Sequence, residues 1–488
     1  MTMLKFKSLI RRLGRLVLLL LLGYPYVIVV LPLSVWLGTY VVSGWLEPGQ
    51  VRGWSWSELT YGIGFTAGVA MLIVLSLVYL AAASYVGWKG HADVYRRGSW
   101  AAIGRPWLHA VITREDLVER IDALAKTHGL VGPIMRVEPL CEPPRRYFYE
   151  SARRATDLAL DFDYCVYAPK AALLPPRETL FRFDTRNRRF EAFLNDENGS
   201  PTALIGVHPC DIHAIRMLDE AFEQDHRDEH YCGRRERLLI VGMDCGEPCT
   251  PGVFCHETKT HFATDGFDVM LYPLRSDSEA TNGQPRADAF GVVYGSDVGC
   301  EWLAADDSAA VRSPTVEDER RFERCLITKN TAFPRRLTQA WNDIPTTLAG
   351  SYDSLVWDAT AQRCYSCGSC NLVCPTCYCF DIQDQNDLPP QSGHRERVWD
   401  GCMLRDFAVV AGGHNFRSDR AQRLRHRIFR KAAWIKKRTG LSGCVGCARC
   451  DRACTAHISI VEILNQLADE HEDGKRDPES LAAATAGV

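Results

Sequence analysis

The chain lacks the sequence patterns with which nucleotide-using enzymes commonly bind phosphate groups. Its 488 residues contain no G-x-G-x-x-G after an expected strand, no P-loop, and no nucleophile-and-base motif of recognisable spacing. Excess charge is also missing, because 57 Lys and Arg residues stand against 60 Asp and Glu residues, a formal net charge of -3. This near-neutral composition gives no sign of a nucleic-acid partner, and the missing motifs leave no visible place for substrate chemistry.

Charged residues are absent from two long stretches near the N-terminus, residues 16–46 and 59–88. Each is longer than the roughly 20 apolar residues that a membrane-spanning helix needs. Lys and Arg precede the first stretch and follow the second, whereas the loop between them offers only Arg52, so the positive-inside rule predicts a hairpin with both ends cytoplasmic. A cleaved signal peptide is the alternative for the first stretch, although its length opposes it.

This hairpin has consequences for localisation and for cofactors. We expect a two-pass protein of the cytoplasmic membrane, with the lipid bilayer as a partner and the bulk of the chain on the cytoplasmic side. Neither stretch contains a histidine, which argues against a haem held between the two helices.

Cysteine, by contrast, is abundant, with 20 residues, and some of them form two runs of identical spacing. Each run reads C-x2-C-x2-C-x3-C, the spacing with which bacterial ferredoxins bind [4Fe-4S] clusters. The runs are Cys364, Cys367, Cys370 and Cys374, then Cys444, Cys447, Cys450 and Cys454. In such pairs the fourth thiolate of each run binds the cluster of the other run, so the sequence predicts two clusters with crossed ligation.

Crossed ligation gives each cluster three cysteines of one run and the last cysteine of the other. The expected sets are Cys364, Cys367, Cys370 and Cys454 for cluster 1, and Cys444, Cys447, Cys450 and Cys374 for cluster 2. Zinc fits less well, because structural zinc sites usually pair two C-x2-C hooks separated by about a dozen or more residues. Disulfides suit small secreted domains, whereas free thiolates indicate a reducing compartment.

Four further cysteines follow expected strands in the middle of the chain and form a candidate third cluster site. They are Cys210, Cys245, Cys249 and Cys255. Ligands of α/β sheets bind beyond the carboxyl ends of strands, so these cysteines are expected to converge there. Their spacing matches no compact motif, and zinc bound with a histidine or simple buried thiols remain as alternatives. The candidate substitute ligands are Asp211, His208 and His213.

Apolar runs alternate with helical patterns between residues 145 and 241, an order typical of an α/β domain. We therefore expect a mixed α+β or α/β chain in four parts. These are a membrane anchor of two transmembrane helices (1–98), a central mixed α/β domain (99–350), an α-helical ferredoxin-like dicluster domain (351–468) and a disordered tail (469–488). Residues 275–307 are expected to form a surface excursion or a pair of irregular strands.

Two features lie between the cysteine runs. Cys377, Cys379 and Cys402 are interpreted as shielding or packing residues, with an alternative-ligand role left open for the first two. Residues 417–438 carry seven Arg and three Lys against one acid. Such a run usually forms a solvated helical face, but it could also dock an acidic partner, touch anionic lipid or raise a cluster's reduction potential.

Several of these segments resemble a known family, which includes the iron–sulfur beta subunits of sulfhydrogenases and the iron–sulfur A subunits of anaerobic sulfite reductases. The resemblance covers roughly residues 110–468 and is carried by CPTCYCFD (374–381), WDGC (399–402), AGGHNFR (411–417), CVGCARC (444–450), LPPRE (174–178), GVHPCD (206–211) and the segment 245–255. It implies a cytoplasmic electron-transfer subunit. Such a subunit relays electrons between two partners. One is a catalytic oxidoreductase subunit, and the other is a flavin-bearing, NAD(P)H-linked flavoprotein reductase subunit.

The chain departs from that pattern at its N-terminal hairpin and at three residues. The hairpin suggests a membrane-tethered complex and a link to quinone. Thr455 stands where proline is usual, and Ala448 stands where glycine is common. Val253 stands where a further cysteine is frequent, and this difference argues against a third cluster.

Three functions are therefore compared. The first is a membrane-tethered electron-transfer subunit with two [4Fe-4S] clusters and a possible third. The second is a self-sufficient membrane oxidoreductase with a quinone or flavin site that no motif reveals. The third is a redox-sensing or assembly protein that docks through its basic run. Reversible reduction of the clusters favours the first two over the third.

Overall fold

A computed structural model describes residues 108–139, 141, 144–192, 201–224, 226–249, 252–275, 287–304, 310–388 and 391–476. These ranges belong to one compact unit that begins at Trp100. The predicted transmembrane hairpin lies outside them. Among the helices within these ranges, none has the length and apolar character needed to cross a membrane.

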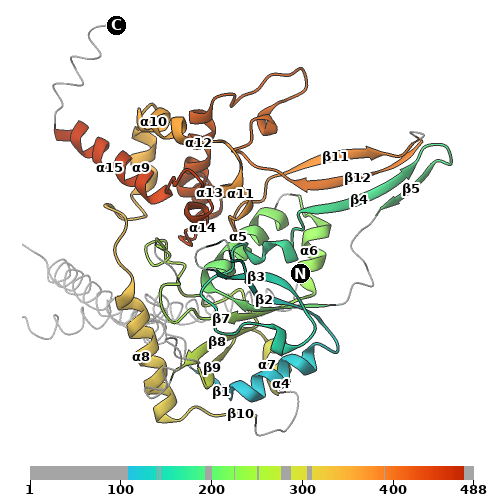
Figure 1. The fold of residues 1–488 in the computed structure, drawn as a ribbon, viewed down its shortest axis with the longest axis vertical. Coiled ribbons are helices and arrows are strands. Elements are labelled where there is room, and N and C mark those ends of the chain that lie inside the picture. Colours follow the sequence, from blue (N-terminus) through green and yellow to red (C-terminus); the bar gives the residue numbers. More distant parts are fainter. Residues whose placement is uncertain are drawn as a thin grey trace, which may run out of the picture. The chain divides into compact units, whose positions relative to one another are not determined.

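The centre of the unit is a mixed sheet of eight strands in the order β10-β1-β9-β8-β7-β6-β2-β3 (Figure 1). Its strands are β1 (Ala110–Thr113), β2 (Gly129–Val137), β3 (Arg145–Ala152), β6 (Thr202–Val207), β7 (Leu238–Met243), β8 (Val269–Leu274), β9 (Ala289–Tyr294) and β10 (Val311–Arg312). Strands β2, β6, β7 and β8 pair in parallel, whereas the strands added at each side are antiparallel. The mixed α/β architecture predicted for this region is confirmed.

Helices cover both faces of this sheet because its strands alternate their apolar side chains between two cores. Leu204 and Ile240 belong to one core, while Ile205 and Val241 belong to the other. The first core also contains residues of α5 (Pro209–Glu223), α6 (Glu229–Glu236) and α8 (Val316–Ala332), and the second contains residues of α4 (Arg114–Leu124) and α7 (Asp297–Ala304). The parallel strands therefore lie between two layers of helices, one packed on each face of the sheet.

Local signals located some of these elements well. Thr113, an N-cap residue type followed three residues later by an acid, caps α4 by accepting a hydrogen bond from the backbone of Asp116. The expectation for residues 275–307 was wrong where the structure describes them, since β9 is a buried strand of the main sheet. Its Ala-Phe-Gly-Val-Val sequence is apolar throughout, as a strand covered on both faces should be, and shows no alternation.

A second sheet has four antiparallel strands in the order β11-β12-β4-β5, which lie side by side in Figure 1. It combines β4 (Arg177–Asp184) and β5 (Arg189–Ala192) from the α/β part with β11 (Phe380–Asn386) and β12 (Ser392–Trp399) from between the cysteine runs. The dicluster segment is therefore not wholly α-helical, which corrects the expectation from sequence. The pairing of β12 with β4 is long-range, and no local pattern encodes it.

Helices dominate the rest of the C-terminal part. They are α9 (Ile344–Gly350), α10 (Val356–Arg363), α11 (Ser369–Leu372), α12 (Arg420–Phe429), the π-helical turn η5 (Arg430–Trp434), α13 (Ile435–Thr439), α14 (Arg449–Arg452) and α15 (Ile460–Arg476). Among the described residues, 3-10 turns form at η2 (Ala155–Asp157) and η3 (Pro169–Ala172) in the α/β part and at η4 (Asp406–Ala408) in the C-terminal part. Residues of α9, α10, α12 and α15 share one core around Trp357 and Phe429. Helix α15 continues past the point where the sequence predicted a disordered tail.

Candidate metal centre

The two cysteine runs fold into loops of the same backbone shape. Ser366 and Gly368 of the first run have positive φ angles of 52° and 77°, and Gly446 and Ala448 at the matching positions of the second run have 65° and 53°. Each loop leads into a one-turn helix, α11 or α14, and these helices contact each other. The shared shape indicates that both runs are built to surround the same kind of group.

Ala448, which stands where glycine is common in the resembling family, keeps the left-handed backbone. That conformation costs an alanine roughly 1–2 kcal/mol. Its side chain is only 3% exposed and packs in a small apolar cluster with Val445 and Val253. The substitution therefore preserves the shape of the loop, and burial of the methyl group offsets part of the strain.

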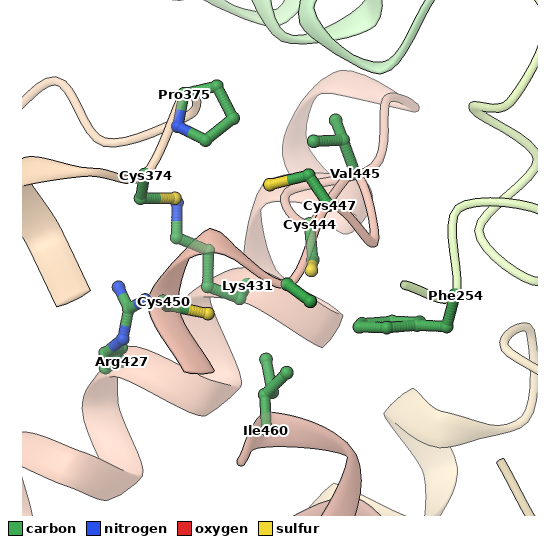
Figure 2. Close-up of a pocket in the computed structure, with 11 residues that line it drawn as sticks. Phe254, Cys374, Pro375, Arg427, Lys431, Cys444, Val445, Cys447, Cys450 and Ile460 are labelled. Carbon is green, nitrogen blue, oxygen red and sulfur yellow. The ribbon is translucent and has the colours of Figure 1, made fainter. Parts of the chain in front are cut away.

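Four thiols from both runs line one cavity, which we call the cluster 2 cavity (Figure 2). Its thiols are Cys374, Cys444, Cys447 and Cys450. These are the four cysteines predicted for cluster 2, so the structure brings that set together across about seventy residues of sequence. Burial raises the pKa of the Cys444 thiol to about 12 and also raises the pKa of Cys450.

The chemistry of this donor set fits a [4Fe-4S] cluster. Thiolate sulfur is the usual ligand of such clusters, and iron supplies the positive charge that buried thiolates need. The cavity is otherwise lined by apolar side chains such as Phe254 and Ile460 and by the cations Arg427 and Lys431, with no carboxylate. Within the described ranges, no three His, Cys, Asp or Glu side chains form a group that could hold a single metal ion.

Buried cations lie against this cavity and the adjoining Cys377. Lys431 is 3% exposed and donates a hydrogen bond of 2.6 Å from Nζ to Oγ1 of Thr376. Burial disfavours the charge of Lys431, but the neighbouring Cys374 and Cys377 thiols hold its pKa above the usual value. Nη1 of Arg427 lies 3.6 Å from Sγ of Cys377. Nζ of Lys170, from the α/β part, donates to the Cys377 carbonyl at 2.9 Å.

The basic run at residues 417–438 is therefore not simply a solvated face. Arg423, Arg427 and Lys431 follow one another at intervals of four residues and are all buried, whereas Lys437 is exposed. The four-residue interval places the buried three on one face along α12 and η5. Of the roles left open by the sequence, this arrangement favours the tuning of cluster potential.

The set predicted for cluster 1 is only partly assembled by contacts that the structure describes. The Cys370 thiol has a pKa of about 11, raised mainly by burial and also by nearby thiols that include Cys364. Cys367 is exposed, and its Sγ lies 3.3 Å from Oγ of Ser369. No hydrogen bond among the described residues joins the Cys454 side chain to the first run, so this crossed ligand remains a prediction.

The four cysteines of the candidate third site, which we call the third thiol group, do converge. Burial raises the pKa of the Cys255 thiol, and Cys245 and Cys249 raise it further. The pKa of Cys210 is likewise raised by burial, with contributions from Cys447 and Cys255. Strands β6 and β7 are parallel neighbours, which brings the segments that follow them to one edge of the sheet.

The third thiol group is also joined to the second cysteine run. The backbone N–H of Phe254 donates to the Gly446 carbonyl at 2.9 Å, and the Thr260 hydroxyl donates to the Val445 carbonyl at 2.7 Å. A Cβ atom at Gly446 would lie 2.5 Å from the backbone nitrogen of Cys255. The third-site loop, described at residues 245–249 and 252–255, therefore contacts the loop that lines the cluster 2 cavity through Phe254 and Cys255.

The suggested substitute ligands mostly have other partners. Asp211 forms a buried, two-point ion pair with Arg449, with distances of 2.6 and 2.7 Å. His213 bonds the Phe262 carbonyl at 2.7 Å. His208 stacks on Phe162 at 4.4 Å between ring centroids. Nε2 of His208 is buried without a hydrogen-bond partner among the described residues, so the four cysteines remain the predicted donor set and His208 the substitute that stays open.

Cys377 and Cys402 occupy a separate buried arrangement. Nδ2 of Asn371 lies 3.5 Å from Sγ of each, so one amide spans both sulfurs. Cys379 is also nearby, and its pKa of about 11 reflects burial first and then the charge of Cys377. This buried geometry agrees with the shielding or packing role expected from sequence.

Comparison with known proteins supplies an independent view of these residues. Residues 363–458 match the model of the 4Fe-4S dicluster domain. The chain is 33% identical over 323 residues to sulfhydrogenase 2 subunit beta of Pyrococcus furiosus, an alignment that covers 66% of this chain and 89% of the relative. The chain belongs to the sulfhydrogenase subunit beta family. This subunit beta homologue is therefore an iron–sulfur protein, and both cysteine runs fall within the matched dicluster domain.

Sequence reasoning missed several residues that shape the centre of this subunit beta homologue. The interval between Arg423, Arg427 and Lys431 could have placed them on one buried face, but a basic helix ordinarily faces water. Lys170 and Phe254 reach the centre from the α/β part. Nothing in their local sequence indicates this, because the contacts depend on how the two parts pack together.

Proposed function

We propose that this protein is an iron–sulfur electron-transfer subunit. The observation that carries the proposal is the cluster 2 cavity, where the last thiol of one run meets three thiols of the other. This is the crossed arrangement in which ferredoxins hold two clusters close together. Two clusters bound in this way form a short path for single electrons.

The third thiol group extends this path into the α/β part. Its loop contacts the loop of the second run at Gly446, so a third [4Fe-4S] cluster would stand next to cluster 2. The order that we propose is the third thiol group, then cluster 2, then cluster 1 near the exposed Cys367.

The name of the relative describes one subunit of a sulfhydrogenase, and we propose an analogous assembly here. In it, the chain relays electrons between a partner and a catalytic oxidoreductase subunit. The partner is either a flavoprotein reductase linked to NAD(P)H or a component linked to quinone. The uncharged stretches 16–46 and 59–88 support anchoring to the cytoplasmic face of a membrane.

Anaerobic metal analysis with EPR spectroscopy tests the proposal. Two clusters correspond to about eight irons per chain and three clusters to about twelve, with equal acid-labile sulfide. Cys374→Ser is expected to perturb the cluster held mainly by the second run, and Cys249→Ser to affect only the third thiol group. Zinc in place of iron, or clusters that cannot be reduced reversibly, would refute the proposal.

A further inference from the structure

A second cavity, of about 690 Å³, lies between the α/β part and the dicluster part. This volume is in the range of small-molecule sites, roughly 300–1,000 Å³. One wall comes from β3 and the segment after it, with Arg146, Tyr164 and Tyr167. The opposite wall comes from α11, α14 and the residues that follow them, such as Leu372 and His457.

The position of this cavity is significant because it adjoins both groups of thiols. Cys249 of the third thiol group lines it directly. Ser369 and Val373 in its wall are the chain neighbours of Cys370 and Cys374, and Ala453 is the neighbour of Cys454. A molecule bound here would therefore touch the third thiol group and lie close to the ligand-bearing loops of both runs.

The walls combine aromatic and cationic groups with two carboxylates, those of Asp163 and Asp451. The Arg452 guanidinium stacks on the Tyr164 ring at 3.9 Å, which makes a broad planar surface. Tyr167 is 47% exposed, so this part of the lining is accessible to solvent. Nε of Arg146 is buried and has no hydrogen-bond partner in the described part of the chain, whereas Nη1 of the same side chain forms an ion pair with Glu138 at 3.6 Å. A planar ring with an anionic tail matches these surfaces, since aromatic walls stack and arginine donors bind phosphate.

We propose that this cavity binds a flavin mononucleotide or a closely related flavin phosphate, which exchanges electrons with the adjacent clusters. The proposal rests on the electron-transfer function proposed above. A reduced flavin gives up two electrons and two protons as its ring is oxidised. The electrons pass singly to two neighbouring [4Fe-4S] clusters, and the protons leave to solvent past the exposed Tyr167. The chain then converts an electron pair into single electrons without a dinucleotide-binding motif.

Binding is tested by titrating FMN into the full-length chain and following the quenching of flavin fluorescence. We expect saturable binding of one FMN, with riboflavin, which lacks the phosphate, bound at least tenfold more weakly. Arg146→Gln should lower the affinity for FMN at least tenfold and leave that for riboflavin unchanged. Arg216→Gln is the control, because Arg216 is equally exposed, at 32% against 31%, and is paired with Asp265 outside the cavity.

A second pair of variants tests the aromatic wall. Tyr167→Ala should weaken both flavins severalfold, whereas Tyr167→Phe keeps the ring and should change neither by more than about twofold. Reduced FMN should also reduce the clusters more slowly in Arg146→Gln than in the unaltered chain. Reduction by dithionite, which does not need the cavity, should be equal in both.

Three results would overturn this assignment. They are a lack of saturable FMN binding, equal binding of FMN and riboflavin, and preferential binding of a naphthoquinone that has no anionic group. A cavity filled by a side chain of a partner protein would give the first result. Failure here is separable from failure of the proposed function, because iron content and the EPR signal after dithionite report the clusters without flavin.

Discussion

Lys431 is expected to raise the reduction potential of the cluster held at the cluster 2 cavity. Its ammonium group lines the cavity with Arg427 and is buried, so water screens it little. Adding an electron to the cluster is more favourable beside a positive charge. Replacing Lys431 by methionine, which has a similar length and no charge, should therefore lower the potential.

The size of this effect follows from Coulomb's law. A unit charge about 7 Å from the cluster, at an effective dielectric constant of about 20, contributes roughly 2 kcal/mol. For a one-electron couple this corresponds to about 100 mV, because 59 mV is a tenfold change in the equilibrium constant. The loss of the hydrogen bond to Thr376 adds little, since that hydroxyl also donates to the Gly443 carbonyl at 2.7 Å.

The assay is an anaerobic redox titration followed by EPR, with iron content measured on each variant. Lys431→Met should shift one signal down by about 100 mV, and Lys431→Arg should keep its potential near the original. Lys437→Met removes the same charge from an exposed position and should shift the potential by less than about 20 mV because of screening. Equal shifts in the two methionine variants, or no shift in Lys431→Met, would show that the buried lysine does not tune the cluster.

Three other predictions concern stability. Gly446→Ala should lower the free energy of unfolding, measured by anaerobic denaturation, by several kcal/mol. Alanine is strained in the left-handed conformation of Gly446, and its Cβ would lie 2.5 Å from the third-site loop. Gly440→Ala is the control, because Gly440 is also left-handed but has open space around it, and it should cost only about 1–2 kcal/mol. Asp211→Asn should cost about 3–5 kcal/mol by leaving its buried arginine partner uncompensated, while the exposed pair of Asp384 should contribute less than about 1 kcal/mol in the same assay. Burial and two neighbouring arginines lower the pKa of His426 to about 4, so as the pH decreases the unfolded state takes up a proton before the folded state does. The free energy of unfolding should therefore fall as the pH decreases from about 6.5 to about 4. Urea unfolding of His426→Gln should show a smaller fall, and an unchanged pH dependence would contradict this.

Much of the fold was visible in short stretches of sequence. The N-cap of α4 and the apolar runs of β6 and β7 are local patterns, and local patterns decide where such elements begin and end. Strand β9 was missed because a strand buried on both faces has no alternation, and its neighbours β1 and β8 lie far away in sequence or across residues 276–286.

The candidate site shows the same division. The spacing of the eight C-terminal cysteines selected the four that line the cluster 2 cavity, because that spacing reflects the geometry of the cluster itself. The cation Lys170 and the aromatic wall at Tyr164 could not be found in this way. Their positions near the cysteine runs depend on how the α/β part and the dicluster part pack together, which includes the pairing of β12 with β4.

The pairing of β12 with β4 has a consequence for how this molecule is put together. Arg397 of β12 is buried between Glu178 of β4 and Asp228, at 2.6 and 2.5 Å, so among the ion pairs of the described residues a charge from the dicluster segment is neutralised by acids of the α/β part. Separating these two segments would leave buried ionised groups without their partners and would expose the edge of a β-strand. Unlike a free-standing ferredoxin, the dicluster segment is therefore not expected to fold when it is transferred to another protein. We expect it to have evolved together with the sheet that supports it.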